Sequence, residues 1–224
     1  GSDYTGKTIS ATRTISISSD TGKTISATRT ITISSDTVKI EASKDSVVRG
    51  NPFSVTITGR PSTSYYLWVK GTGQMSGTAT DMPPILVQDQ DNVVNDPIGG
   101  PYTIGSYQYE GGAGRTIKED VPNFPYNGVY YYASVKTSTS GTRTVGWQTS
   151  QDTKDKKYTI RVEREDAGQY KSDEVDVKVE KGTVTVVAAG DQSYFMGQEV
   201  KLSGTNSETD YTYLFITGPN LPSA

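Results

Sequence analysis

The stretch EVDVKVE, residues 174–180, alternates apolar and charged side chains along its whole length. A period of two is that of a β-strand, whose successive side chains point to opposite faces of a sheet. The same alternation occurs at Ile31 and Ile33, whereas no long stretch repeats apolar residues at the three- and four-residue spacing of a helix. The sequence therefore predicts an all-β protein.

Glycine and proline interrupt the alternating stretches at short intervals. Short strands separated by turns are typical of two packed sheets, so we expect an antiparallel immunoglobulin-like β-sandwich, in the sense of architecture alone. Trp68 and Trp147 are expected between the two sheets. The expected strands are residues 37–43, 53–59, 64–70, 84–88, 102–109, 129–137, 142–149, 157–163 and 172–180.

Two internal repeats are present. Residues 5–20, TGKTISATRTISISSD, recur as residues 21–36 with one change, Ser16 to Thr32, which indicates a duplication, recent or engineered. A fainter repeat appears between residues about 146 positions apart, where alternating apolar pairs and turn glycines match in order. The matched positions are Ile31 and Ile33 with Val177 and Val179, residues 37–40 with 183–186, Gly50 with Gly197, Gly59 with Gly204, and residues 66–69 with 213–216.

The repeats predict a tandem organisation. Residues 1–36 are expected to be the duplicated closing strand of a preceding repeat. Residues 37–181 are expected to form one complete β-sandwich domain. Residues 183–224 are expected to be the opening strands of the next repeat.

A short pattern lies at residues 165–170, EDAGQY. It resembles the tyrosine corner of immunoglobulin domains, in which Tyr170 would bond back across the turn and Ser172 would stand at the place of the second core cysteine. An ordinary β-turn between two strands explains the same residues equally well. Both interpretations remain open at the level of sequence.

Composition limits the chemistry. The chain has no cysteine and no histidine, which removes disulfides, thiol catalysis, the commonest zinc ligands and most familiar acid–base machinery. The net charge is −3 and the 22 basic residues are scattered, so no nucleic-acid partner is expected. The sequence contains no apolar stretch of the roughly 20 residues that span a membrane. We predict no catalytic residue, no enzyme activity and no required cofactor.

The acidic loop at residues 89–96 is the best candidate for a metal site, because clustered oxygen ligands suit Ca²⁺. It lacks the turn glycine and the closing glutamate of an EF-hand, and acidic loops between strands are more often solvated turns. The candidate ligands are Asp89, Asp91, Asn92, Asn95 and Asp96.

Tyrosines crowd residues 126–132, with Phe124 beside them. They form either an aromatic platform for a sugar or part of a strand in which Tyr130 and Tyr132 share one face and Tyr131 points to the other. Packing within the fold is the favoured interpretation. No pair of carboxylates is singled out in the way that a glycosidase requires.

Four runs of sequence, KDSVVRGNPF at 44–53, YYLWVKG at 65–71, WQT at 147–149 and KYTI at 157–160, are together similar to the repeated domains of methanogen S-layer surface glycoproteins. The similarity covers most of residues 37–218. It implies an archaeal cell envelope, an exported protein and lateral self-assembly into a sheet. One feature departs from this family, because such proteins are commonly N-glycosylated and this chain has no Asn-x-Ser/Thr site.

The expected function is that of an extracellular, surface-layer-like structural protein whose partners are copies of itself. Residues 183–217 supply too few strands for a sandwich and leave open edges, which a further strand can pair. The duplicated segment corresponds to a closing strand of the same kind of unit, so we expect strand addition, either head-to-tail between copies or within one chain. The alternative function is a carbohydrate- or ligand-binding adhesion module that binds cell-surface glycans.

Overall fold

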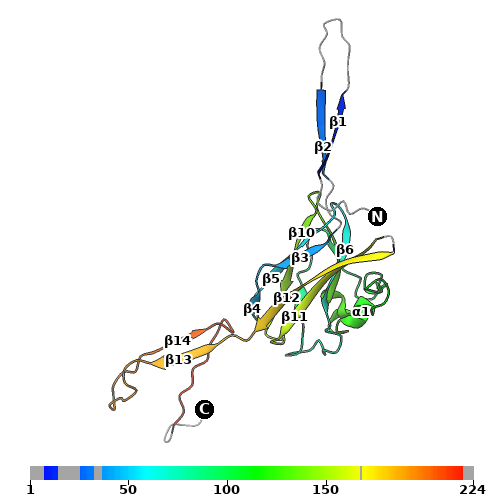
Figure 1. Cartoon of the computed structure of the whole chain (residues 1–224). Helices are drawn as coiled ribbons and strands as arrows, with labels where there is room; N and C mark the ends of the chain where they lie inside the picture. The colour runs from blue at the N-terminus through cyan, green and yellow to red at the C-terminus, as the bar shows by residue number, and fades with distance from the viewer. Residues whose placement is uncertain (1–7, 15–25, 33–36, 167, 219–224) are drawn as a thin grey trace. The chain divides into compact units, whose positions relative to one another are not determined.

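The protein is described here by a computed structural model that covers residues 8–14, 26–32, 37–166 and 168–218 (Figure 1). The chain divides into two compact units, Gly1–Thr37 and Val38–Ala224. In the first unit, β1 (Thr8–Thr14) and β2 (Ser26–Thr32) form an antiparallel hairpin in which Thr8 pairs with Thr32 and Thr14 with Ser26. Each strand of this hairpin comes from one copy of the duplicated segment.

The second unit contains two sheets around one core. One sheet has the order β3-β5-β10-β7, and the other has the order β4-β12-β11-β6-β9-β8. All described neighbours in these sheets pair antiparallel except β4 and β12, which are parallel, so the second sheet is mixed. The strands are β3 (Lys39–Ala42), β4 (Ser46–Val48), β5 (Phe53–Thr58), β6 (Ser64–Lys70), β7 (Ile85–Leu86), β8 (Val93–Val94), β9 (Tyr132–Lys136), β10 (Thr142–Gln148), β11 (Lys157–Asp166) and β12 (Gln169–Glu180).

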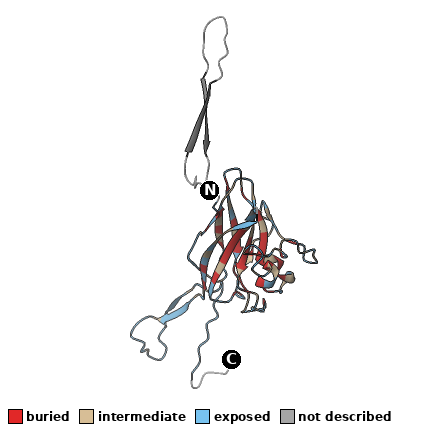
Figure 2. Cartoon of the chain, turned by 45° about the vertical axis from the view of Figure 1, so that its right-hand side comes forward, coloured by how far each residue is buried: buried red, intermediate tan, exposed pale blue. Residues whose placement is uncertain are grey.

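The core follows from the alternation in the strands. Phe53, Val55 and Ile57 of β5 are buried while their neighbours are more exposed, and the buried residues concentrate in this body of the chain (Figure 2). Trp147 is fully buried and stacks on Phe53, with ring centroids 6.3 Å apart. The predicted position of Trp147 between the sheets is confirmed, and so is the all-β class.

Trp68 is also fully buried, but on the other face of its sheet. It lies opposite Arg161 and Tyr132 in the pairing, whereas Leu67 and Val69 lie opposite Val162 and Ile160 of the inner face. The prediction that Trp68 fills the space between the sheets is therefore wrong. A segment that follows β8 covers it, so the larger sheet is covered on both faces around Trp68.

This covering segment, residues 95–121, replaces the strand that the sequence predicted at 102–109. It contains a short helix, α1 (Ile117–Asp120), which is capped by Thr116 and Glu119 in a reciprocal capping box. Gln108 and Thr116 form only an isolated bridge. The tyrosine-rich stretch likewise begins as the 3-10 helix η1 (Tyr126–Tyr131).

The helical turn η1 overturns the predicted alternation of the tyrosines. Asn127 and Gly128 have left-handed backbone angles (φ 55° and 76°), which turn the chain before β9 begins. Tyr131 and Tyr132 are both fully buried, while Tyr130 is only partly buried.

The tyrosine corner predicted at residues 165–170 is absent from its expected place. Asp166 and Tyr170 instead belong to the hairpin that joins β11 to β12, and Tyr170 is 43% exposed. The β-turn interpretation is the correct one. Ser172 accepts a hydrogen bond from Nη2 of Arg161 at 3.1 Å, which is a polar environment and not that of a core cysteine.

The second unit continues into another antiparallel hairpin, formed by β13 (Val184–Ala188) and β14 (Leu202–Asn206). Residues 213–216, which the repeat matches to residues 66–69 of β6, do not form a strand in the structure. Within the described residues, no helix has the length and apolar character needed to cross a membrane.

Candidate functional site

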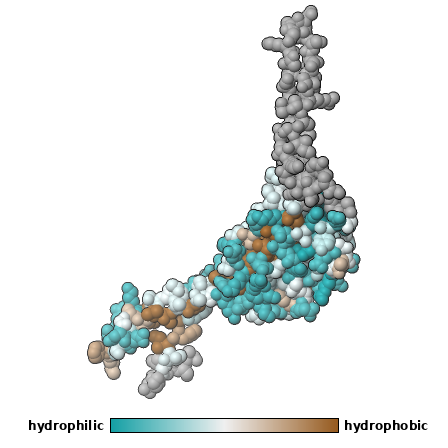
Figure 3. Space-filling model, viewed as in Figure 1, coloured by the Kyte–Doolittle hydropathy of each residue, from teal (hydrophilic) through white to brown (hydrophobic). Residues whose placement is uncertain are grey.

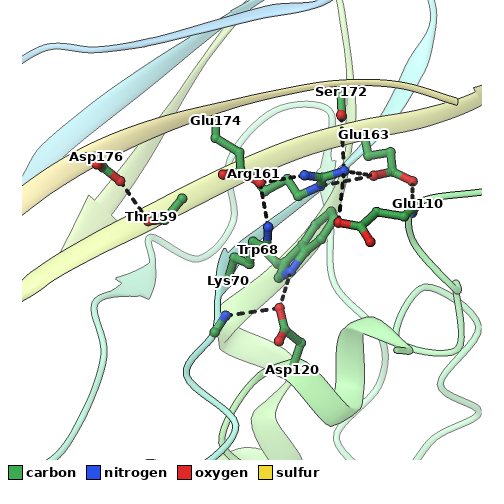
Figure 4. Close-up of polar contacts among 11 residues, drawn as sticks. Trp68, Lys70, Glu110, Asp120, Thr159, Arg161, Glu163, Ser172, Glu174 and Asp176 are labelled. Atoms are coloured by element: carbon green, nitrogen blue, oxygen red, sulfur yellow. Dashed lines mark hydrogen bonds and ion pairs between the residues drawn. The ribbon is translucent and has the colours of Figure 1, made fainter. Parts of the chain in front are cut away.

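A cluster of charged side chains lies on the outer face of the larger sheet, beneath the covering segment (Figure 4). Arg161 and Glu163 point out of this face because they alternate with the inward Ile160 and Val162. The guanidinium of Arg161 donates to Oε2 of Glu163 from Nε at 3.0 Å and from Nη2 at 2.6 Å. It also donates to Glu174 on the neighbouring β12.

The covering segment is tied to this cluster through Glu163. Oε1 of Glu163 accepts a hydrogen bond from the Tyr107 hydroxyl at 2.9 Å and from the Glu110 backbone N–H at 2.7 Å. The ring of Tyr107 stacks on Tyr66 of β6, with centroids 3.9 Å apart. The fully buried carboxylate of Glu163 therefore joins the sheet to its cover.

The contacts of the cluster shift the pKa values of Arg161, Glu174 and Tyr107. Burial by itself lowers the pKa of Arg161, but hydrogen bonds to Glu163 and Glu174 outweigh it and the net shift is upward. Burial acts to raise the pKa of Glu174, yet hydrogen bonds from Lys70 and Arg161 lower it overall. Burial, and then the hydrogen bond to Glu163, raises the pKa of the Tyr107 hydroxyl.

Two further carboxylates hold the covering segment. Oδ2 of Asp120 accepts from Nε1 of Trp68 at 2.9 Å and from the Gly71 N–H at 3.0 Å. Asp96 accepts from the backbone of Ile104 and Gly105 and from the Tyr132 hydroxyl, at 2.8–3.1 Å. Because these acids are already satisfied by several donors, the cluster acts to fix the cover on the sheet.

The predicted calcium ligands separate into two groups. Asp89, Asp91 and Asn92 are exposed in the turn before β8, whereas Asn95 and Asp96 follow β8. The Asn95 amide donates to the carbonyls of Val129 and Tyr132, at 2.7 and 2.9 Å. Among the described residues, no group of three or more acidic side chains is arranged to hold a metal ion. Calcium binding by this loop stays a prediction.

The structure reduces the proposed aromatic platform to a smaller group. Phe124 is 56% exposed and Tyr126 is 50% exposed, and the rings of Tyr126 and Tyr130 are 4.5 Å apart. Tyr126 has φ 55°, a left-handed value that is unfavourable for an aromatic residue. The rings of Tyr126 and Tyr130 lie together, and Phe124 is exposed close by in the sequence, whereas Tyr131 and Tyr132 are buried.

The C-terminal hairpin and the residues that follow it, up to 218, carry the largest group of exposed apolar side chains among the described residues (Figure 3). Monomeric proteins rarely expose contiguous apolar surface on this scale, so such a surface marks a binding site or an unfinished core. The residues are Val184, Val186, Val187, Phe195, Met196, Val200, Leu202, Tyr211, Tyr213, Leu214, Phe215 and Ile216.

The hairpin repeats the pairing of β3 with β5 residue for residue. We call the part of the second unit that contains β3 to β12 the first domain. Ile40 pairs with Ile57 in the first domain, and Val186 pairs with Gly204 in the hairpin. The next hydrogen bond is repeated too: it joins the Ser43 N–H to the Ser54 carbonyl at 2.8 Å, and the Ala189 N–H to the Lys201 carbonyl at 2.8 Å. The predicted match of Gly59 with Gly204 is thus two residues off, because Gly204 takes the place of Ile57.

The turn between these strands is repeated as well. In the first domain the Asn51 N–H donates to the Val48 carbonyl at 3.1 Å, and Gly50 has φ 90°. In the C-terminal hairpin the Gln198 N–H donates to the Phe195 carbonyl at 3.0 Å, and Gly197 has φ 85°. The predicted match of Gly50 with Gly197 is confirmed in the backbone, and both glycines occupy a conformation that other residues rarely adopt.

Comparisons with known proteins add little. No family model and no curated protein matches the chain. Among solved structures, the chain is similar to the one described as the crystal structure of BslA, a bacterial hydrophobin, at 11% sequence identity and a TM-score of 0.28. The likeness covers 64% of this chain and 98% of that chain, and at this TM-score it carries no argument.

Proposed function

We propose that this protein is a structural, extracellular protein that self-assembles through immunoglobulin-like β-domains arranged in tandem. One observation carries the proposal: the β13–β14 hairpin repeats the register and turn of β3 and β5, about 146 residues further along the chain. Such repetition supports the presence of a second domain of the same kind, which begins directly after β12. The covered outer face of the first domain, fixed by Arg161 and Glu163, supports a scaffold role.

The order of the strands supports the immunoglobulin-like assignment. The orders β3-β5-β10-β7 and β4-β12-β11-β6-β9-β8 follow the A-B-E-D and G-F-C-C′-C″ orders of variable-type immunoglobulin sheets, with β4 added beside the last strand. The order of the strands along the chain differs from that in immunoglobulin domains. Strand β7, in the place of D, comes before β8 and β9, which are in the places of C″ and C′. These orders support an immunoglobulin-like architecture with its own connections.

The cellular location rests on the sequence. The similarity of residues 37–218 to methanogen S-layer repeats supports a place in an archaeal surface layer. The exposed apolar side chains of the C-terminal hairpin support association between copies, since apolar surface of this kind is usually covered in the working protein.

Sedimentation velocity of the purified chain over a range of concentrations tests the proposal. We expect the average mass to rise with concentration, and Leu214→Lys to reduce this association because it places a charge within the exposed apolar group. Val94→Lys is the matched control, because Val94 is similarly exposed but lies on the edge strand β8. A chain that remains a monomer at every concentration would overturn the proposal.

The alternative function is a glycan-binding adhesion module. One observation favours it: the rings of Tyr126 and Tyr130 lie 4.5 Å apart, and Tyr126 is 50% exposed although its backbone has the left-handed φ of 55°. Sugars stack their apolar faces on such rings. Glycan-array screening of the chain separates this function from a purely structural one.

A further inference from the structure

The first domain shows what covers an opening hairpin of this type. Strand β12 lies beside β3 and β4, where Oδ2 of Asp173 accepts from the Ile40 N–H at 2.9 Å and the Lys178 N–H donates to the Asp45 carbonyl at 2.9 Å. Val177 and Val179 of β12 are buried against the core. The β11–β12 hairpin therefore closes the domain over the strands that open it.

The C-terminal hairpin lacks this cover in the described part of the chain. Ile40 is 3% exposed, whereas its counterpart Val186 is 59% exposed. Strand β13 pairs with β14 as β3 pairs with β5, but no described segment lies beside β13 as β12 lies beside β3. An element of the character of β11 and β12 fits beside such a hairpin.

The β1–β2 hairpin has this character. Its strands pair antiparallel across a sequence that contains Asp-Thr-Gly at residues 20–22, as β11 and β12 pair across Asp-Ala-Gly at 166–168. In the 146-residue register, Ile31 of β2 corresponds to Val177 of β12. The sequence register thus favours β2 as the counterpart of the closing strand β12.

Charge favours the same pairing. Strands β1 and β2 contain Arg13 and Arg29 and no acidic residue. Residues 183–218 contain four carboxylates and one lysine, a net charge of −3. Complementary charge of this kind steers association and disfavours the pairing of like segments.

We infer that the β13–β14 hairpin of one copy receives the β1–β2 hairpin of a second copy, with β2 in the place that β12 takes beside β3 and β4. This inference rests on the proposed function and names the partner and the register of its assembly. Repeated from copy to copy, the contact is heterologous and builds an open fibre.

Cross-linking tests the register directly, because the chain has no cysteine. Asp173 and Ile40 are in contact in the first domain, and their counterparts are Ala27 and Val186. Chains carrying Ala27→Cys are mixed with chains carrying Val186→Cys and treated with a short bismaleimide. We expect a covalent dimer that contains one chain of each kind.

Two matched pairings serve as controls. Ala11 is the counterpart of Ala27 in the first copy of the duplication, and Thr144 is an exposed residue of β10, outside the C-terminal hairpin. Ala11→Cys with Val186→Cys, and Ala27→Cys with Thr144→Cys, are each expected to give several times less dimer. Equal dimer yields from Ala11→Cys and from Ala27→Cys, each mixed with Val186→Cys, would overturn the assignment of β2 to the place of β12.

Sedimentation of the same cysteine variants separates the two proposals. If the chains associate but Ala27→Cys and Val186→Cys do not cross-link, the inferred contact is overturned while self-assembly stands. If the chains do not associate at all, both are overturned.

Discussion

Arg161 and Glu163 lie two residues apart on β11, and the guanidinium of Arg161 donates two hydrogen bonds, of 3.0 and 2.6 Å, to the carboxylate of Glu163. Glu163→Ala leaves this buried cation with one fewer carboxylate and leaves the Tyr107 hydroxyl and the Glu110 N–H without their acceptor. Breaking a buried pair in this way costs about 3–5 kcal/mol, so we expect a loss of stability of that size in urea-induced unfolding.

Glu41→Ala is the control for this loss. Glu41 pairs with Lys39 at 2.6 Å on the surface, where ion pairs contribute about 0–1 kcal/mol. Similar losses in the two variants would contradict a role for Glu163 in joining the sheet to its cover.

The second anchor of the cover is Asp120. Asp120→Ala removes the acceptor of the Trp68 indole N–H and of the Gly71 N–H, and leaving the buried indole donor unpaired costs about 1–3 kcal/mol. We expect this loss in unfolding experiments, together with a changed near-ultraviolet circular dichroism signal from Trp68. Asp155→Ala, which removes an exposed partner 3.6 Å from Lys181, should leave both readouts nearly unchanged.

One ion pair makes stability depend on acid pH. The hydrogen bond from Lys154, followed by that from the Ser76 N–H, lowers the pKa of Asp81 from 3.8 to about 2. A carboxyl with a lowered folded pKa stabilises the protein above its unfolded pKa, and this contribution disappears as pH falls through the folded value. In Asp81→Asn we therefore expect thermal midpoints below those of the original chain at pH 5, and convergence of the two curves towards pH 2. Parallel curves would contradict the assignment.

Substitutions at two glycines distinguish the cost of backbone strain from the cost of close packing. Gly71 and Gly77 have nearly equal φ values of 70° and 71°, but a Cβ at Gly77 would lie 1.6 Å from the Phe124 carbonyl oxygen, whereas one at Gly71 meets nothing within 4 Å. Gly71→Ala should cost about 1–2 kcal/mol for the left-handed conformation alone. Gly77→Ala should cost roughly 1–3 kcal/mol more, because the chain at Phe124 must move. Denaturant titration of both variants measures the difference.

The aromatic surface gives a test of the alternative function. If a glycan binds, Tyr126→Ala should weaken its affinity roughly 5- to 10-fold, which corresponds to about 1 kcal/mol for one stacked ring. Tyr170→Ala is the control, because Tyr170 is also exposed but lies on the β11–β12 hairpin. Isothermal titration with the strongest glycan from the array gives both values, and equal weakening would place the sugar elsewhere.

The strands of the two sheets were predictable where alternation alone decides the structure. Strands β5 and β10 lie within a residue of the predicted ranges, because one face of each is buried in the core. The stretch at 102–109 also alternates, yet it is not a strand. There the Asp96 carboxylate gathers the backbone N–H groups of Ile104 and Gly105, and this polar contact outweighs the local pattern.

The polar cluster was not predictable in the same way. Arg161 and Glu163 alternate with apolar residues, which is the pattern of a solvated outer face. A signal was present in β6, where Leu67, Trp68 and Val69 are apolar in succession. A strand that is apolar on both sides is covered on both sides, but the sequence does not tell which distant segment provides the cover.

The parallel pairing of β4 with β12 has a mechanical consequence. The chain enters the first domain through β3 and β4 and leaves it through β12, and Ser46 lies opposite Lys178 while Val48 lies opposite Glu180. Tension along the chain pulls these two parallel strands in opposite directions along their length, across the 2.9 Å bonds from Lys178 to Asp45 and from Arg49 to Glu180. The load is a shear that reaches these bonds together, whereas a strand pair pulled apart from one end opens one bond at a time.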